Sequence, residues 1–217
     1  MLFNSHVFLL FFAAFLLLYW LVQANLRARN LLIVAASYLF YGWWDARFLV
    51  LVFLSTGLDY SVGLVLARTR EPTKRKTWLA LSIAGNLGML GFFKYYNFFV
   101  NSAAIALGQL GILVHLPTLN IVLPVGISFY TFQTMSYAMD VYRGDLAATR
   151  SFLNFMAYVA FFPQLVAGPI ERGRHLLPQF ERPARITRAM LEEGLWLMLW
   201  GLFKKVVLAD NLAPLVD

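Results

Sequence analysis

The fold of this chain is decided by residues 161–172, FFPQLVAGPIER, which close an uncharged run over residues 151–170. Two prolines and a glycine interrupt the end of this run. A lipid bilayer tolerates a broken helix only where the freed backbone groups are buried in protein or line a wet cavity. We therefore expect residues 163–169 to be non-helical and packed inside the protein. Functional groups are then expected within a membrane-embedded region rather than on a soluble domain.

The composition indicates the same environment. Hydrophobic residues make up 60% of the chain and charged residues 13%, against about 25% charged residues in soluble domains. A soluble domain of this size could not hide so much apolar surface. Residues 1–26 carry no charged side chain, and Arg27 and Arg29 follow them. A secretory signal has its basic residues before the apolar run, so we predict an integral membrane protein with an uncleaved first span.

The net charge of +7 comes largely from two basic clusters that lie between apolar runs. Such clusters are typical of cytoplasmic loops and of contacts with anionic membrane lipid rather than nucleic acid. The absence of cysteine excludes disulfides, zinc fingers and thiol nucleophiles within these residues. The clusters contain Arg68, Arg70, Lys74, Arg75 and Lys76, and then Arg172, Arg174, Arg182, Arg185 and Arg188.

The apolar runs predict an all-α, polytopic transmembrane protein with about seven or eight membrane segments, some of them short or broken. Residues 1–217 are expected to form a single transmembrane domain. The predicted segments cover residues 7–22, 30–44, 48–67, 77–93, 97–114, 123–139, 151–167 and 194–203.

The charge pattern also predicts an orientation in the cell (inner) membrane. With the N-terminus extracytoplasmic, Arg27, Arg29 and the cluster at 68–76 fall on the cytoplasmic side. Four further crossings bring the cluster at 172–188 back to that side. The loop at 144–150, which is nearly balanced in charge, is then expected on the outside.

Five segments, taken in order, carry a family resemblance. Together they resemble the N-terminal part of the membrane-bound O-acyltransferase family, in the branch of alginate O-acetyltransferases and the related teichoic-acid D-alanyl transferase. The segments are YYNFF at 95–99, LPVGISFYTFQ at 123–133, DVYR at 140–143, FPQLVAGPIER at 162–172 and FKKVVLAD at 203–210.

The resemblance implies transfer of an acetyl group from a cytoplasmic thioester donor, acetyl-coenzyme A or an acylated carrier, to an extracytoplasmic polysaccharide such as alginate. Partner proteins outside the membrane are implied as well, whereas no bound cofactor is. Members of the family are longer, and their essential histidine lies in a later segment rich in aromatic residues and arginine. No such segment precedes Asp217, so the chain is expected to be the front part of a longer domain and inactive alone.

Three other functions stay open. One is D-alanyl transfer to teichoic acid, which the same resemblance allows. The others are a non-catalytic scaffold subunit and a polysaccharide or lipid transporter. A transporter is expected to show paired repeats, and none is visible in the sequence.

The histidines are His6, His115 and His175. Acyl transfer to a hydroxyl needs a base, and histidine is suited to that role near neutral pH. All three lie outside the predicted spans, where an interfacial histidine is the ordinary case. Their spacing offers no metal-binding pair. No catalytic residue and no metal ligand is therefore assigned in this chain.

Five polar residues are the candidates for lining a substrate cavity: Gln164, Glu171 and Arg172 at the broken run, and Ser128 and Gln133 on the predicted segment at 123–139. Ser128 and Gln133 lie on one predicted helix with Asp140, where hydrogen bonding between helices is an equal alternative. An ion pair at the membrane surface is the alternative for Glu171 and Arg172. Asp59, inside an apolar span, is a further functional candidate or a structural partner of a neighbouring helix.

Overall fold

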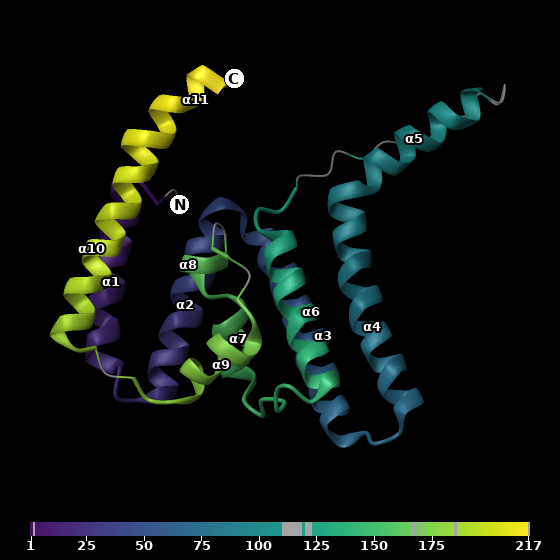
Figure 1. The fold of residues 1–217 in the computed structure, drawn as a ribbon, viewed down its shortest axis with the longest axis horizontal. Helices are drawn as coiled ribbons and strands as arrows, with labels where there is room; N and C mark the ends of the chain where they lie inside the picture. Colours follow the sequence, from purple (N-terminus) through teal and green to yellow (C-terminus); the bar gives the residue numbers. More distant parts are fainter. Residues whose placement is uncertain are drawn as a thin grey trace.

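The computed structural model describes residues 1, 3–109, 119, 123–165, 168–169, 171–184 and 186–216. These residues form helices and connections without a strand, which confirms the all-α prediction (Figure 1). The elements in chain order are α1 (His6–Val22), α2 (Leu26–Asp45), η1 (Ala46–Phe48), α3 (Leu49–Arg68), α4 (Pro72–Leu90), η2 (Gly91–Tyr95), α5 (Tyr96–Gln109), α6 (Ile127–Arg143), α7 (Phe152–Val159), α8 (Phe162–Leu165), α9 (Gly173–Glu181), α10 (Arg188–Phe203), η3 (Lys204–Ala209) and α11 (Asp210–Val216).

Local capping sets where α2 begins. The Asn25 side chain accepts hydrogen bonds from the backbone N–H groups of Arg27 and Ala28, both at 3.1 Å. Such a cap satisfies donors that would otherwise be orphaned in the first turn. The helix therefore starts at Leu26 and has 20 residues, so the prediction of a short segment over 30–44 is wrong.

The helix that begins at Pro72 does not end near Lys94 as predicted. It passes through the π-helical turn η2 and continues as α5 to Gln109. Residues 95–99 contain no proline or glycine, so nothing local stops the helix, and the π turn only bends it. In Figure 1, α5 leaves the end of α4 and points away from the other helices. Of the separate segment predicted at 97–114, residues 110–114 lie outside the described residues.

The ends of α4 and α6 lie together. The Arg75 guanidinium, near the start of α4, donates hydrogen bonds to the carbonyl oxygens of Leu66 (2.5 Å) and Tyr142 (2.6 Å). The Tyr60 hydroxyl donates to the Arg150 carbonyl at 2.7 Å. The loop at 144–150 is therefore beside the α3–α4 connection, and its predicted place on the opposite side is wrong. Residues 97–109 of the expected return crossing instead continue the helix of α4 as part of α5.

The predicted span at 151–167 is broken into two short helices, α7 and α8. An eight-residue helix such as α7 is about 12 Å long, whereas a bilayer core is about 30 Å thick. After α8 the chain turns back towards the end from which α7 started (Figure 1). The predicted crossing is therefore wrong, and we call residues 161–172 the re-entrant segment.

The interior of the re-entrant segment agrees in part with the sequence prediction. Gln164 and Leu165 are buried, as is Phe162 just before them, but Pro163 and Pro169 are exposed, so packing inside the protein is confirmed only in part. The segment is not wholly non-helical, however, because Pro163 lies within the single turn of α8. Proline is tolerated there because the first turn of a helix needs no donor from its N–H. Gly168 and Pro169 are non-helical, and residues 166, 167 and 170 lie outside the described residues.

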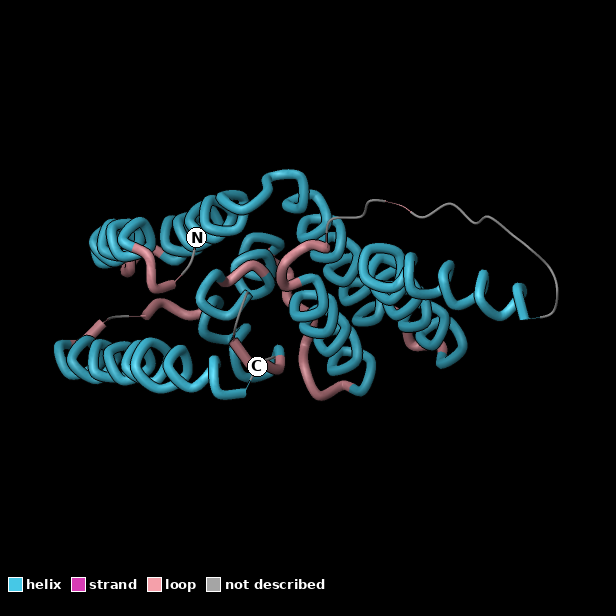
Figure 2. The backbone as a smooth tube through the Cα atoms, turned by 90° about the horizontal axis from the view of Figure 1, so that it is seen from above, coloured by secondary structure: helices cyan, strands magenta, loops and turns pink. Residues whose placement is uncertain are grey.

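The last helix is longer than predicted. The Thr187 side chain accepts from the backbone N–H of Met190 at 3.2 Å and starts α10 at Arg188. The helix then continues through the π turn η3 into α11. Figure 2 shows this helix, which leads to the C-terminus, on one side of the molecule and the N-terminal helix on the other.

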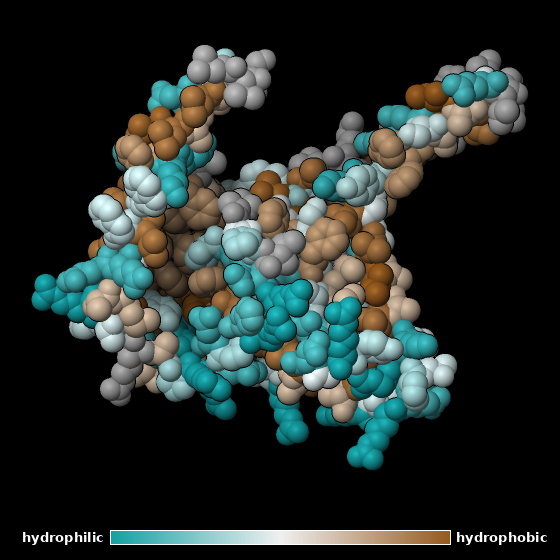
Figure 3. Space-filling view, viewed as in Figure 1, coloured by the Kyte–Doolittle hydropathy of each residue, from teal (hydrophilic) through white to brown (hydrophobic). Residues whose placement is uncertain are grey.

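One end of the molecule collects most of the charge. It holds the α1–α2, α3–α4 and α6–α7 connections and α9, and we call it the basic end. Figure 3 shows hydrophilic residues concentrated there and hydrophobic residues above. By length and composition, one helical stretch of the described residues, Leu26–Arg68, qualifies to cross a membrane, and α1 is a shorter apolar helix. The predicted seven or eight spans are thus not confirmed.

Candidate functional site

The re-entrant segment is held by helices that are distant in sequence. The backbone N–H of Phe162 donates to the Ser37 hydroxyl of α2 at 3.1 Å. The Tyr41 hydroxyl, one turn further along α2, donates to the Val125 carbonyl at 2.7 Å. This second bond ties α2 to the residues just before α6. A backbone N–H of residues 161–172 is therefore satisfied by the Ser37 side chain within the protein, as a broken helix in an apolar setting requires.

Gly126 brings the start of α6 against the re-entrant segment. Its φ is 75°, and a Cβ built on it would lie 2.6 Å from the Leu165 carbonyl oxygen. A side chain would be both strained in the left-handed region and in collision with backbone. Glycine at this position thus lets two sequence motifs, 123–133 and 162–172, touch directly.

Gln164 closes the turn of the re-entrant segment. Its side-chain Nε2 donates to the Pro169 carbonyl at 2.7 Å, and its own carbonyl accepts from the Gly168 N–H at 3.0 Å. A Cβ on Gly168 would lie 2.7 Å from the Gln164 Cα, so the turn is tight. The amide of Gln164 is thus engaged by backbone.

The side-chain amide of Gln133, on α6, also binds a backbone carbonyl. Its Nε2 donates to the Tyr158 carbonyl near the end of α7 at 3.0 Å. The Tyr158 hydroxyl in turn donates to the carbonyl oxygen of Glu171 at 3.3 Å. Gln133 and Tyr158 are both buried. Gln133 is thereby linked through Tyr158 to Glu171 of the re-entrant segment, which also contains Gln164 and Arg172.

Ser128 lies apart from the re-entrant segment, and Arg172 is at its exposed end. Ser128 is half-buried at the start of α6, where its hydroxyl lies 3.4 Å from Lys94 Nζ. Arg172 is exposed, and its carbonyl accepts from the His175 N–H at 3.0 Å as α9 begins. Among the ion pairs of the described residues, none joins Glu171 to Arg172. That the five residues line a substrate cavity stays a prediction.

The sequence interpretation missed Arg29 and Asn30. The Arg29 guanidinium, only 1% exposed, donates to the carbonyl oxygens of Gln179 (3.0 Å) and Arg182 (2.9 Å) at the end of α9. Asn30 Nδ2 donates to the Phe180 carbonyl at 2.6 Å. A cation at a helix C-terminus is favoured by the helix dipole and satisfies orphan carbonyls. The sequence did carry a signal, because Arg29 and Asn30 directly precede the apolar run of α2. Only the fold shows that these two side chains bind the carbonyls of α9.

Asp59 is part of a separate buried polar cluster between α3, α4 and α6. Its carboxylate accepts from the Ser82 hydroxyl at 2.5 Å and from Asn86 Nδ2 at 2.7 Å. Ser55 and Thr134 extend the cluster through the Asn86 side-chain oxygen. All five side chains are buried. This arrangement corresponds to the structural alternative for Asp59, a partner of neighbouring helices.

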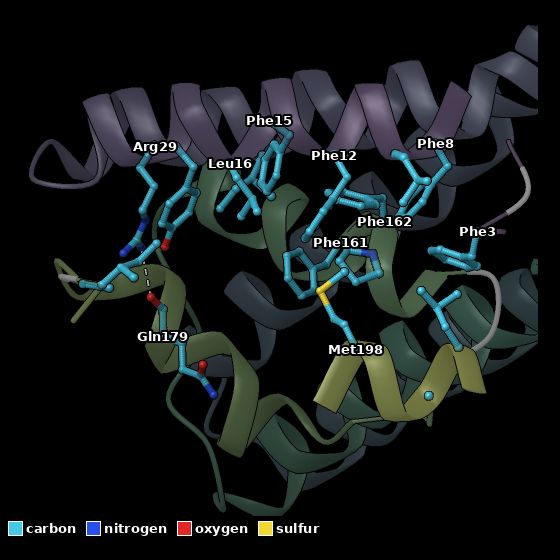
Figure 4. Close-up of a pocket in the computed structure, with 18 of the residues that line it drawn as sticks. Phe3, Phe8, Phe12, Phe15, Leu16, Arg29, Phe161, Phe162, Gln179 and Met198 are labelled. Carbon is cyan, nitrogen blue, oxygen red and sulfur yellow. Dashed lines mark hydrogen bonds between the residues drawn. The ribbon is translucent and has the colours of Figure 1, made fainter. Parts of the chain in front are cut away.

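A cavity of about 1020 Å³ adjoins the re-entrant segment between α1 and α10. Its walls are mainly aromatic, and Figure 4 shows phenylalanines from α1 facing Phe161, Phe162 and Met198, with Arg29 and Gln179 at one end. None of the five candidate residues is among those that line it. An apolar space of this kind can hold a hydrocarbon chain but offers few polar groups for chemistry.

The described part of the chain offers no buried histidine as a base for acyl transfer. His6 and His175 are exposed, and His115 lies outside the described residues. Within that part, no group of three or more histidine, cysteine or acidic side chains could hold a metal ion. Gln133, Gln164 and the backbone of the re-entrant segment can bind and orient, but they cannot act as a base.

Comparison with known proteins gives relatives along the whole chain. It is 44% identical over 219 residues to a probable alginate O-acetylase, AlgI, of Azotobacter vinelandii, an alignment that covers 100% of this chain and 43% of the relative. It is 32% identical over 247 residues to a peptidoglycan O-acetyltransferase of Helicobacter pylori, covering 100% of this chain and 46% of that protein.

A teichoic acid D-alanyltransferase of Lacticaseibacillus rhamnosus is more distant, with 26% identity over 144 residues, 64% of this chain and 31% of the relative. No protein-family model matches the chain, and no solved structure matches it significantly. The chain spans less than half the length of these curated relatives. Because proteins named as O-acetylases align with every part of it, the chain belongs to the membrane-bound O-acyltransferase family, among the relatives of alginate O-acetylases.

Proposed function

We propose that the complete protein containing these residues is a membrane enzyme that moves an acetyl group from a thioester to a hydroxyl of an extracytoplasmic polysaccharide such as alginate. The observation that carries this proposal is the 44% identity with an alginate O-acetylase across the whole chain. The peptidoglycan O-acetyltransferase relative supports the same reaction on a different glycan. The donor, acetyl-coenzyme A or an acylated carrier, reaches the protein from the cytoplasm in this proposal.

The reaction requires a base and a dry site. The acceptor hydroxyl oxygen attacks the thioester carbonyl carbon, the C–S bond breaks, and the sulfur leaves as a thiolate. The hydroxyl proton passes to a base, which we place outside the residues described here because both described histidines are exposed. The contribution of the re-entrant segment is a rigid, water-poor backbone beside the transfer path, which limits hydrolysis of the thioester.

The orientation in the membrane is part of the proposal. The gathering of basic residues at one end (Figure 3) supports a cytoplasmic basic end, since positively charged loops stay inside. The N-terminus, at the opposite end of α1, is then extracytoplasmic. The five candidates Ser128, Gln133, Gln164, Glu171 and Arg172 remain our proposal for groups near the acyl-transfer path.

The test is genetic and chemical. The complete reading frame is deleted in the source organism, and ester-bound acetate on the purified exopolysaccharide is measured by NMR before and after mild alkali. Loss of acetate upon deletion and its return upon complementation are expected. Unchanged acetate would refute the proposal. Loss of ester-bound alanine from teichoic acid would instead favour the D-alanyl transfer for which the distant relative is named.

Arg172 allows a residue-level test with a close control. Arg172 and Arg174 are both exposed near the start of α9. If Arg172 helps to line the transfer path, Arg172→Ala lowers acetylation more than it lowers protein abundance, whereas Arg174→Ala changes neither. Parallel losses of acetylation and abundance in Arg172→Ala would assign Arg172 a purely structural role.

A further inference from the structure

The cavity between α1 and α10 combines mainly apolar walls with a buried arginine at one end, and the proposed acyl transfer does not explain this combination. Phe8, Phe12 and Phe15 line it from one face of α1, and Phe161 and Phe162 line it from the re-entrant segment. None of the residues of α10 is buried, although Met198 and Leu202 of that helix line the opposite wall. The space is therefore a hydrocarbon-like slot between two helices rather than a packed interface (Figure 4).

A positive charge without an acidic partner lies at one end of this slot. Arg29 lines the cavity and uses three of its five N–H groups on neutral oxygen atoms, those of Asn30, Gln179 and Arg182. Among the described ion pairs none involves Arg29. The other lining cation, Lys205, is paired with Asp210. The carbonyls at the end of α9 offset part of this charge but carry no full negative charge, so the Arg29 end favours an anion nearby.

The dimensions fit one leaflet of a membrane. Phe8 and Tyr19 both line the cavity and are separated by about 16 Å along the helix axis. Half of a bilayer's hydrocarbon core is about 15 Å thick. Arg29 is at the basic end of the molecule, next to the exposed residues Arg27 and Arg182. If this end faces the membrane surface, Arg29 lies at the level of the lipid headgroups.

We propose that this cavity is a phospholipid-binding site in which an acyl chain lies along the phenylalanine face of α1 and an anionic headgroup lies at the Arg29 end. The acyl chain packs against the aromatic side chains of the walls, and the phosphate compensates the buried guanidinium charge. This site goes beyond the proposed acyl transfer and does not depend on it. It binds an intact lipid, and no bond is made or broken.

The test uses the complete protein in nanodiscs that contain phosphatidylglycerol with a photoactivatable diazirine on its acyl chain. After irradiation, cross-linked peptides are identified by mass spectrometry. Adducts are expected on cavity-lining residues of α1 and on Phe161 and Phe162. Adducts confined to the exposed side of α1, at Leu10 and Leu17, would overturn the proposal. So would the absence of adducts in the cavity, which would mean that protein side chains fill it.

Two variants fill the slot from opposite walls and keep the test independent of a single mutant's folding. Leu16→Trp and Met198→Trp are each expected to lower cavity adducts several-fold. The control is Leu17→Trp, which adds the same bulk on the 61%-exposed neighbour of Leu16 and is expected to leave them unchanged. Variants are compared only at equal monodispersity. Equal yields of cavity adducts in Leu16→Trp, Met198→Trp and Leu17→Trp would refute an acyl chain in the cavity.

The headgroup part is tested by competition. Unlabelled phosphatidylglycerol is expected to displace the probe several-fold better than phosphatidylcholine, and this preference is expected to shrink in Arg182→Gln. Neither Arg182 nor Arg174 lines the cavity, and both are exposed, but the Arg182 carbonyl accepts from Arg29 whereas Arg174 lies near the start of α9, so Arg174→Gln is the matched control. Equal competition by the two lipids would overturn the anionic headgroup at the Arg29 end.

Discussion

Gly126 offers the sharpest test of how the re-entrant segment is held. An alanine at this position would add a Cβ at φ 75° and 2.6 Å from the Leu165 carbonyl oxygen. The left-handed backbone alone costs about 1–2 kcal/mol for a residue with a Cβ. Separating the Cβ from backbone adds a further cost of about 1–3 kcal/mol, as in an overpacked core. Gly126→Ala is thus expected to destabilise the protein by about 2–5 kcal/mol.

Two other glycines separate the cost of the left-handed backbone from the cost of the Cβ contact. Gly144 also has positive φ, 85°, but a Cβ there meets no atom within 4 Å, so Gly144→Ala should cost only the backbone term of about 1–2 kcal/mol. Gly88 is helical and open, so Gly88→Ala should be neutral or stabilising by up to about 1 kcal/mol.

The assay is thermal unfolding of the complete protein in detergent, followed by the fraction that remains monodisperse on size exclusion. The expected order of midpoints is Gly88→Ala at or above wild type, then Gly144→Ala, then Gly126→Ala. Polysaccharide acetylation in cells should fall most in Gly126→Ala. A midpoint for Gly126→Ala equal to or above that of Gly144→Ala would refute the contact between α6 and the re-entrant segment.

Three further outcomes follow from the packing. Asp59→Leu leaves the donors of Ser82 and Asn86 without their acceptor and should destabilise the protein by about 1–3 kcal/mol, measured in the same thermal assay; a neutral result would contradict the structural role of Asp59 between α3 and α4. Arg29→Gln should lower the midpoint more than Arg27→Gln, which removes the same charge from an exposed position of the same helix; equal effects would show that the α9 carbonyls do not need Arg29. Because the chain has no cysteine, Asp145→Cys should resist a membrane-impermeant thiol reagent in intact cells as well as a cysteine at residue 73 does; labelling of residue 145 alone would place the 144–150 loop on the other side.

Local rules identified many of the elements of this fold. The apolar runs placed α1 and α3 to within about two residues, and the prolines and glycine of 161–172 marked the break correctly. The ordered motifs indicated the family, which the relatives confirm. These features depend on composition, on hydrophobic run length and on residues that cannot continue a helix, and all of them can be read in a short window.

The path of the chain after each break depended on distant partners. Lys94 and the aromatic residues after it permit either a stop or a π turn, and the structure has the π turn. The run at 151–170 could cross or return, and it returns where Ser37, 125 residues before Phe162, and Gly126 meet its backbone.

The roles of the polar side chains were likewise decided by tertiary contacts. Gln133 and Gln164 were predicted to line a cavity, and their amide groups bind the backbone carbonyls of Tyr158 and Pro169. The burial of Arg29 followed from α9 packing its C-terminal carbonyls against α2. The sequence by itself determined where regular helix must fail, because that is a property of neighbouring residues. Only the tertiary structure decided which groups satisfy the backbone freed there, because those donors and acceptors come from helices far along the chain.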